Sequence, residues 1–141
     1  YIHSVERISK LSSVISINGG VQLDLMGQEN AESTGTRQLS GVGGQMDFLE
    51  GAYRSKGGKG FICINSSRVT KDGERKSNIL ATIPGGSTIS APRTMIQYVA
   101  TEYGIASLSG KTLRERAEAM ASIAHPDFRE ELMKYAQENF K

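Results

Sequence analysis

Short β-branched runs alternate with segments of helical periodicity along this chain, and this alternation restricts its fold more than any other feature. Strands are predicted where apolar residues run together or alternate with polar ones, at residues 14–18, 21–25, 61–64, 78–83 and 95–100. Helices are predicted where apolar residues recur on one face, at residues 5–11, 45–53, from 113 and again from 126. Interleaved strands and helices are typical of an α/β domain, with a mixed or mostly parallel sheet flanked by helices.

Local signals place several helix ends. Ser4 is a predicted N-cap for the first helix. Thr112 and Glu115 have the spacing of a capping box, in which a hydroxyl and a carboxylate each pair with a backbone amide. Pro126 interrupts the helix that follows this box and can open another. The last third is therefore predicted to be two consecutive helices.

Glycines and polar residues predict the connections. Gly19 and Gly20 separate the first two strands, which are predicted to pair as a hairpin around them. The polar residues 27–40 predict a loop or an irregular edge, and residues 71–74 predict a turn between two strands. Since 141 residues suit one compact unit and no linker interrupts them, a single domain is expected over residues 1–141.

Composition excludes several classes of protein. No apolar run approaches the roughly 20 residues of a spanning helix, and the N-terminus has no signal-peptide pattern, so a cytoplasmic protein is expected. The net charge is +2 and charges of both signs are interspersed, which speaks against a nucleic-acid-binding surface. The first residue is Tyr1 and not Met, so the natural chain is expected to be longer upstream and truncated here.

The single cysteine, Cys63, is predicted to be a buried, inert thiol in a strand because apolar residues flank it. It has no partner for an internal disulfide. No helix start or nearby histidine in the sequence would activate it as a nucleophile. With one cysteine and two histidines, no zinc site is predicted.

The strongest local signal for chemistry lies at residues 40–48, where three glycines come just before a predicted helix. Glycine lets the backbone approach a ligand closely, and a helix start offers unpaired amides. Together these suit an anion or a developing oxyanion. The spacing matches neither the P-loop nor the dinucleotide-binding fingerprint, and an ordinary tight turn is the alternative.

Two charged residues are further candidates. Lys56 ends the predicted helix beside a second glycine pair and could meet a phosphate of a cofactor; a solvated loop is the alternative. Glu102 follows a predicted strand and could orient a substrate or a water molecule. A surface acid or a helix-cap partner is the alternative for Glu102.

Nine short segments along nearly the whole chain match one known family in the same order. They are residues 14–18, 21–25, 27–33, 40–48, 55–58, 91–93, 101–104, 114–117 and 125–129. This collinear set resembles the C-terminal region of the acetyl-CoA hydrolase/transferase family. Within it, the likeness is to 4-hydroxybutyrate and butyryl-CoA:acetate CoA-transferases. Such a set is far more specific than any single glycine loop.

The resemblance implies a CoA-transferase α/β fold, with two related domains in the complete enzyme. It also implies a ping-pong reaction, in which a glutamate passes through an acyl-glutamyl anhydride to a glutamyl-CoA thioester and a second acid then takes the CoA. In this family that glutamate lies upstream of everything in residues 1–141. The fragment alone is therefore predicted to be inactive.

Roles carry over by position. Gly44 resembles the glycine whose amide faces the thioester or anhydride oxygen, and Glu102 resembles a second active-site carboxylate. His3 stands where related enzymes can have Asn. The resemblance implies a CoA site lined by Gly20, Ser40, Gly44 and Lys56. It implies acyl-CoA and a short-chain carboxylate as substrates, no permanently bound cofactor, and as partners the N-terminal half of the enzyme and further copies of it.

Two alternatives stay open. In a CoA-thioester hydrolase, water would replace the second acid. A free-standing CoA-binding or assembly module without catalysis would explain the missing glutamate. A nucleic-acid module built on residues 111–116 is remote, since glutamates alternate with the arginines there.

Overall fold

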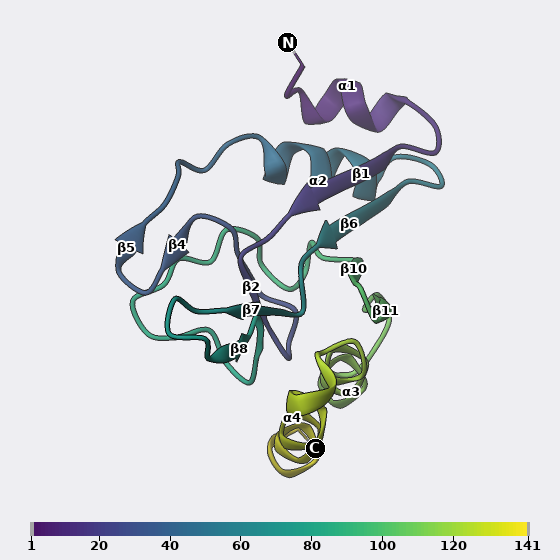
Figure 1. The fold of residues 1–141 in the computed structure, drawn as a ribbon. Coiled ribbons are helices and arrows are strands. Elements are labelled where there is room, and N and C mark those ends of the chain that lie inside the picture. The colour runs from purple at the N-terminus through teal and green to yellow at the C-terminus, as the bar shows by residue number, and fades with distance from the viewer. Residues whose placement is uncertain (1, 141) are drawn as a thin grey trace.

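The structure is a computed structural model that describes residues 2–140 (Figure 1). Its helices are α1 (Val5–Lys10), α2 (Gln45–Arg54), α3 (Leu113–Ser122) and α4 (Pro126–Asn139). Its strands are β1 (Ile15–Gly19), β2 (Gln22–Asp24), β3 (Glu29–Asn30), β4 (Ser33–Thr34), β5 (Arg37–Gln38), β6 (Lys59–Cys63), β7 (Ser67–Val69), β8 (Arg75–Ser77), β9 (Ile79–Leu80), β10 (Tyr98–Thr101) and β11 (Gly104–Ser107).

The main sheet has four strands in the order β1-β6-β10-β11. Strands β1, β6 and β10 are parallel, and β11 is antiparallel to β10. The carboxyl ends of the three parallel strands therefore meet at one edge. Helix α2 runs back along β1 and β6, so its first residue lies toward that edge and its last residue toward the opposite one (Figure 1). The predicted α/β class with a mostly parallel sheet is confirmed.

The predicted hairpin between the first two strands is wrong. β1 pairs with β6, whereas β2 lies in a second sheet of order β3-β2-β9. A two-residue hairpin turn requires positive φ, and neither Gly19 nor Gly20 is among the positive-φ glycines. Instead the Gly20 amide donates to the Cys63 carbonyl and the next amide donates to Asn30, so the chain passes from one sheet to the other.

Other departures from prediction are local. The predicted loop over residues 27–40 contains β3, β4 and β5, because the buried Asn30 side chain accepts hydrogen bonds from the amides of Glu32 and Ser33 and organises the turn. The strand predicted at 78–83 is only two residues long, the one predicted at 95–100 begins at Tyr98, and β11 was not predicted. The turn at 71–74 is confirmed as the β7–β8 connection.

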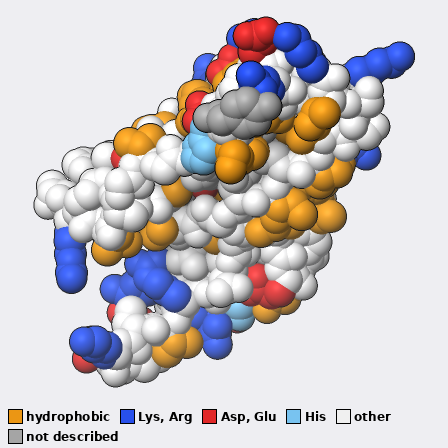
Figure 2. Space-filling view, turned by 90° about the horizontal axis from the view of Figure 1, so that it is seen from above, with side chains coloured by type: hydrophobic (Ala, Val, Ile, Leu, Met, Phe, Trp, Pro, Cys, Tyr) orange, Lys and Arg blue, Asp and Glu red, His pale blue; other side chains and the backbone are white. Residues whose placement is uncertain are grey.

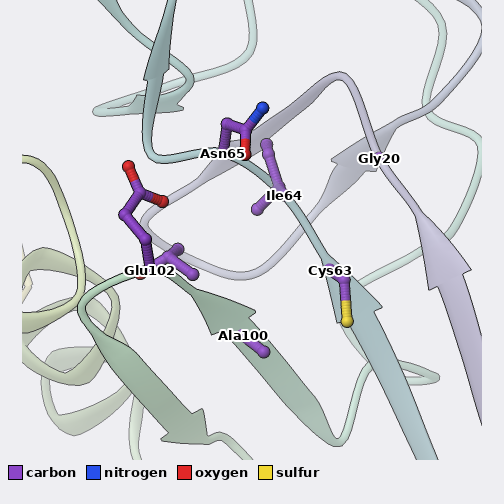
Figure 3. Close-up of a pocket in the computed structure, with 7 residues that line it drawn as sticks. Gly20, Cys63, Ile64, Asn65, Ala100 and Glu102 are labelled. Atoms are coloured by element: carbon purple, nitrogen blue, oxygen red, sulfur yellow. The ribbon is translucent and has the colours of Figure 1, made fainter.

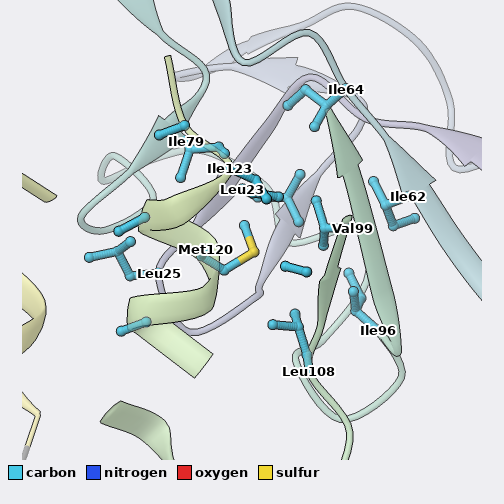
Figure 4. Packing of buried hydrophobic residues seen from close by; sticks show 14 of the residues in the cluster. Leu23, Leu25, Ile62, Ile64, Ile79, Ile96, Val99, Leu108, Met120 and Ile123 are labelled. Carbon is cyan, nitrogen blue, oxygen red and sulfur yellow. The ribbon is translucent and has the colours of Figure 1, made fainter. Parts of the chain in front are cut away.

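The helix starts follow the predicted caps. Ser4 accepts a hydrogen bond from the Arg7 amide, and Thr112 and Glu115 form the reciprocal capping box of α3. Pro126 is the first residue of α4. Side chains from both sheets and from α2, α3 and α4 form one core, which includes Leu49 and Leu132. Figure 4 shows other members of this core, among them Leu23, Leu25, Ile62, Val99 and Met120.

Candidate functional site

A cavity of about 460 Å³ opens where the three parallel strands end. Its lining comes from Gly20 after β1, residues 63–65 at the end of β6, and residues 100–102 at the end of β10 (Figure 3). Ligands of open α/β sheets bind outside the carboxyl ends of strands, because the loops there are free to vary. This cavity is therefore the candidate site, and it brings the predicted residues Gly20 and Glu102 together.

The Glu102 carboxylate is held at the cavity by Ser66. One oxygen accepts a hydrogen bond from the Ser66 amide at 2.9 Å, and the other accepts one from the Ser66 hydroxyl at 2.7 Å. Desolvation would raise the pKa of Glu102, but the hydrogen bonds from Ser66 outweigh it and hold that pKa below its ordinary value. Glu102 is therefore a fixed, ionised acceptor at neutral pH, able to orient a donor but poorly suited to give up a proton.

The predicted glycine loop lies at the start of α2. Gly44 is the N-cap residue and provides no side-chain cap. The imidazole of His3 packs directly over it, so a Cβ at Gly44 would overlap the ring. His3 also contacts Asp47, with Nδ1 3.4 Å from Oδ2, and meets the edge of Phe48. The structure thus brings His3, which stands where related enzymes can have Asn, into contact with Gly44, the glycine that the resemblance placed near the substrate.

Glu29 is a buried residue of this region that the sequence reading missed. Its side chain is fully buried, and both carboxylate oxygens accept from Nε2 of Gln45, at 2.7 and 2.6 Å. A Cβ added to Gly20 would lie 2.8 Å from Oε1 of Glu29. Glu29 therefore links two predicted positions: it lies directly behind Gly20, and it holds the residue that follows Gly44. Its flanks Gln28 and Asn30 are polar, so nothing local signalled burial.

Neither Gly44 nor the other two predicted CoA contacts, Ser40 and Lys56, is among the residues that line the cavity. Ser40 is exposed in the loop before α2, where its amide donates to the Glu32 carbonyl at 3.3 Å. Lys56 is exposed just after α2, and its carbonyl accepts from the Ser13 amide at 2.8 Å near the amino end of β1. Ten residues of helix, about 15 Å, separate the Gly44 end of α2 from the Lys56 end. Both assignments stay predictions.

Comparison with known proteins shows the family. The sequence model for the acetyl-CoA hydrolase/transferase C-terminal domain matches residues 1–136. The chain belongs to this family. The family predicted from the collinear segments is thereby confirmed.

Curated members of the acetyl-CoA hydrolase/transferase family are similar to the chain over nearly all its length. It is 47% identical to a butyryl-CoA:acetate CoA-transferase of Anaerostipes caccae, over 97% of this chain and 31% of the relative. It is also 47% identical to a 4-hydroxybutyrate coenzyme A transferase of Clostridium kluyveri, over 99% of this chain and 32% of the relative. The chain thus spans about a third of the length of these relatives.

Solved structures with similar folds agree with this family assignment. RipA from Yersinia pestis superimposes with a TM-score of 0.85 at 38% identity, over 98% of this chain and 30% of that one. A 4-hydroxybutyrate CoA-transferase from Porphyromonas gingivalis gives 0.77 at 40% identity, over 99% of this chain and 30% of that one.

The structure corrects the prediction for Cys63. The residue does lie in a strand, but it is exposed and lines the cavity. Residues alternate between the two faces of β6, and Ile62 takes the core side, which leaves Cys63 on the open face. Apolar flanks alone did not distinguish the two faces.

Cys63 is therefore expected to react in the folded chain. The chain has one cysteine, so a thiol reagent such as Ellman's reagent should modify one thiol per chain without denaturant. In the Cys63→Ser variant the reagent should modify no thiol. A thiol that reacts only after denaturation would contradict the exposed position. In the full-length enzyme, Cys63→Ser is expected to retain activity, because no hydrogen bond or ion pair in the described residues engages the thiol.

Two kinds of site receive no support from residues 2–140. In that range no group of three or more His, Cys, Asp or Glu side chains is placed to hold a metal ion. None of the described helices is long and apolar enough to cross a membrane.

Proposed function

We propose that this chain is the C-terminal part of a CoA-transferase that moves CoA between a short-chain acyl-CoA, butyryl- or 4-hydroxybutyryl-CoA, and acetate. The observation that carries the proposal is the cavity at the carboxyl ends of β1, β6 and β10, with the ionised Glu102 at its rim, in a chain 47% identical to transferases of that description.

The reaction requires a carboxylate nucleophile, which we place in the upstream part of the enzyme. Its oxygen attacks the thioester carbon, CoA leaves as a thiolate, and an acyl-glutamyl anhydride forms. The thiolate then attacks the glutamyl carbonyl and releases the first acid. Acetate takes the CoA by the same two steps in reverse. In this scheme the Gly44 amide stabilises the oxyanion of each attack, and Glu102 orients the reacting groups.

One face of the main sheet supports the N-terminal part of the enzyme as the partner of this chain. Helices α2 and α3 pack on the face that carries Ile62 and Val99. The opposite face exposes Ile15, Ile17 and Ile105, which are 53%, 69% and 63% accessible. In Figure 2, hydrophobic side chains form a continuous group at the right of the view, besides smaller groups elsewhere on that face. Apolar surface of this kind marks an interface, and the relatives are about three times longer than this chain.

The remaining parts of the proposal follow from this assignment. CoA and acyl-CoA are substrates, and no permanently bound cofactor is needed. The complete enzyme is cytoplasmic and assembles from several copies. It acts without nucleic acid or membrane as a partner.

An exchange assay on the full-length enzyme tests the proposal. Butyryl-CoA is incubated with and without acetate, and both acetyl-CoA and free CoA are measured. Formation of acetyl-CoA that depends on acetate identifies a transferase. Release of free CoA at the same rate without acetate identifies a hydrolase instead and overturns the proposal. The 141-residue chain alone is expected to show neither, and turnover by it near the full-length rate would contradict the upstream nucleophile.

Lys56 is expected to affect substrate binding and not the chemical step. In the full-length enzyme, Lys56→Ala should raise the apparent KM for acyl-CoA by about 1.5-fold to fivefold, the range of one exposed charge contact, with kcat unchanged. Lys71→Ala, which removes an exposed lysine from the β7–β8 turn, is the control and should change neither constant. A lower kcat with unchanged KM would assign Lys56 a different role.

A further inference from the structure

Glu29 occupies a fixed position behind the candidate site. Its amide donates to the Ala91 carbonyl at 3.0 Å, and its carbonyl accepts from the Ser90 amide at 2.8 Å. The same residue pairs with Leu23 of β2. Backbone contacts on both sides therefore fix where its side chain begins.

The side chain reaches from β3 to the first residue of α2. Both carboxylate oxygens accept from the Gln45 amide nitrogen, as described above. Gly44, the preceding residue, has no side chain with which to anchor the start of the helix, and no side-chain cap bond forms there. The Glu29–Gln45 pair supplies the missing anchor, because it holds the first turn of α2 against the second sheet.

The space around the carboxylate is tightly filled. A Cβ at Gly20 would lie 2.8 Å from Oε1 of Glu29 and 3.1 Å from the Ile62 side chain. The cavity wall at Gly20 therefore rests on the Glu29 carboxylate. A displacement of the Glu29 side chain would therefore move both the cavity wall at Gly20 and the start of α2.

We propose that Glu29 is a positioning residue, which holds the Gly44 amide in place for the transfer reaction through its hydrogen bonds to Gln45. The role rests on the proposed function, since it assumes that the Gly44 amide faces the reacting carbonyl. Glu29 itself is fully buried and does not touch substrate.

The hydrogen bonds between Gln45 and both oxygens of Glu29 depend on the charge of Glu29. Among residues 2–140, Glu29 belongs to none of the ion pairs. The groups around its side chain are the Gln45 amide from α2 and Gly20, the residue after β1, and its backbone pairs with Ser90 and Ala91. Asp47, an acidic residue in the first turn of α2, has its Oδ2 3.4 Å from Nδ1 of His3.

Protonation would change this geometry near neutral pH. Burial raises the pKa of Glu29 from 4.5 to about 7, and the hydrogen bond from Gln45 opposes that rise. Above this pH the carboxylate has only acceptors, so both oxygens can receive the Gln45 amide. Below it, one oxygen carries a proton and becomes a donor, so only the other oxygen can still accept from Gln45 Nε2 and the contact with both oxygens is lost. The contact of Gln45 Nε2 with both oxygens therefore belongs to the ionised form of Glu29.

The test compares two variants of the full-length enzyme with wild type: a single substitution of Glu29, and a double substitution, called the swap, that exchanges residues 29 and 45. Glu29→Gln keeps the shape of the side chain but cannot ionise, and Glu29→Gln with Gln45→Glu exchanges the two groups across the same contact. Wild-type kcat should rise through one step near pH 7. Glu29→Gln should lose that step and lower kcat at pH 8 by about tenfold, with KM for butyryl-CoA unchanged, since a misplaced catalytic group costs rate at the chemical step. The swap should recover kcat to within about threefold.

Hydrogen–deuterium exchange of residues 41–48 provides a readout that does not need activity. Exchange should be faster in Glu29→Gln than in wild type at pH 8 and should return toward wild type in the swap. Glu138→Gln, which neutralises an exposed acid in α4, is the control and should change neither exchange nor kcat.

Each outcome decides the inference. Unchanged kcat, pH profile and exchange in Glu29→Gln overturn it. A fall in kcat that the swap repairs neither in rate nor in exchange also overturns it, because Glu29 would then serve packing alone. If wild type transfers no CoA to acetate, the proposed function fails, and the exchange of residues 41–48 in the three proteins still decides whether Glu29 positions this loop.

Discussion

Gly44→Val in the full-length enzyme is expected to lower kcat by on the order of 10²–10³, the usual cost of losing one oxyanion donor. Two structural facts support a large effect. Gly44 is the N-cap of α2, where the backbone amides at the helix start have no helical partner. The His3 ring already occupies the space in which a side chain would grow, so valine must displace the ring or twist the backbone.

A matched control lies in the same loop. Gly41 is exposed and has open space around it, so Gly41→Val makes the same change of residue without a clash and should leave kcat near wild type. His3→Ala combined with Gly44→Val separates two causes of loss. If displacement of the ring is the only damage, the double variant recovers; if the valine blocks the oxyanion donor, it stays inactive. A folded Gly44→Val enzyme with wild-type kcat and KM would show that the loop is only a turn.

Features set by neighbouring residues could be predicted. The capping box of Thr112 and Glu115 and the proline that opens α4 act within one turn of helix, and the structure places them as expected. The turn before β8 was predictable for the same reason. Pairing between strands was not, because the partner of β1 is β6, more than forty residues further along the chain. The glycine pair at the end of β1, Gly19 and Gly20, is compatible with either a hairpin or a crossing between sheets.

In the candidate site, too, some features could be predicted from the sequence and others could not. Glu102 and Gly20 follow parallel strands, and the geometry of such sheets brings strand ends together, so their meeting at one cavity was predictable. The burial of Glu29 was not, because it is produced by Gln45 and Ala91, sixteen and sixty-two residues away in sequence. The exposure of Cys63 depends on which face of β6 the helices cover. That too is decided by packing between distant segments.

Arg116→Met is expected to lower the free energy of unfolding of this chain by about 3 kcal/mol. Arg116 is only 9% accessible, and its guanidinium donates to three backbone carbonyls, those of Met26, Leu108 and Arg93, at 2.8–2.9 Å. These carbonyls come from three separate connections, so one side chain joins the second sheet and the main sheet to α3. Methionine fills part of the volume but leaves the carbonyls without that donor, at about 1–3 kcal/mol for each one that water cannot reach. Release from the cost of burying a cation offsets part of this loss.

Urea unfolding of the 141-residue chain, followed by circular dichroism, measures the effect. Arg114→Met is the matched control, because Arg114 lies two residues earlier in the same helix, is exposed, and forms an i,i+4 pair with Glu118 at 3.0 Å. Its loss should cost only about 0.3–0.5 kcal/mol. Arg116→Lys should behave like the methionine variant, since an ammonium group cannot reach three carbonyls that the planar guanidinium spans. If Arg116→Met costs no more than Arg114→Met, water replaces the guanidinium at these carbonyls and the three connections are held together by the apolar core alone.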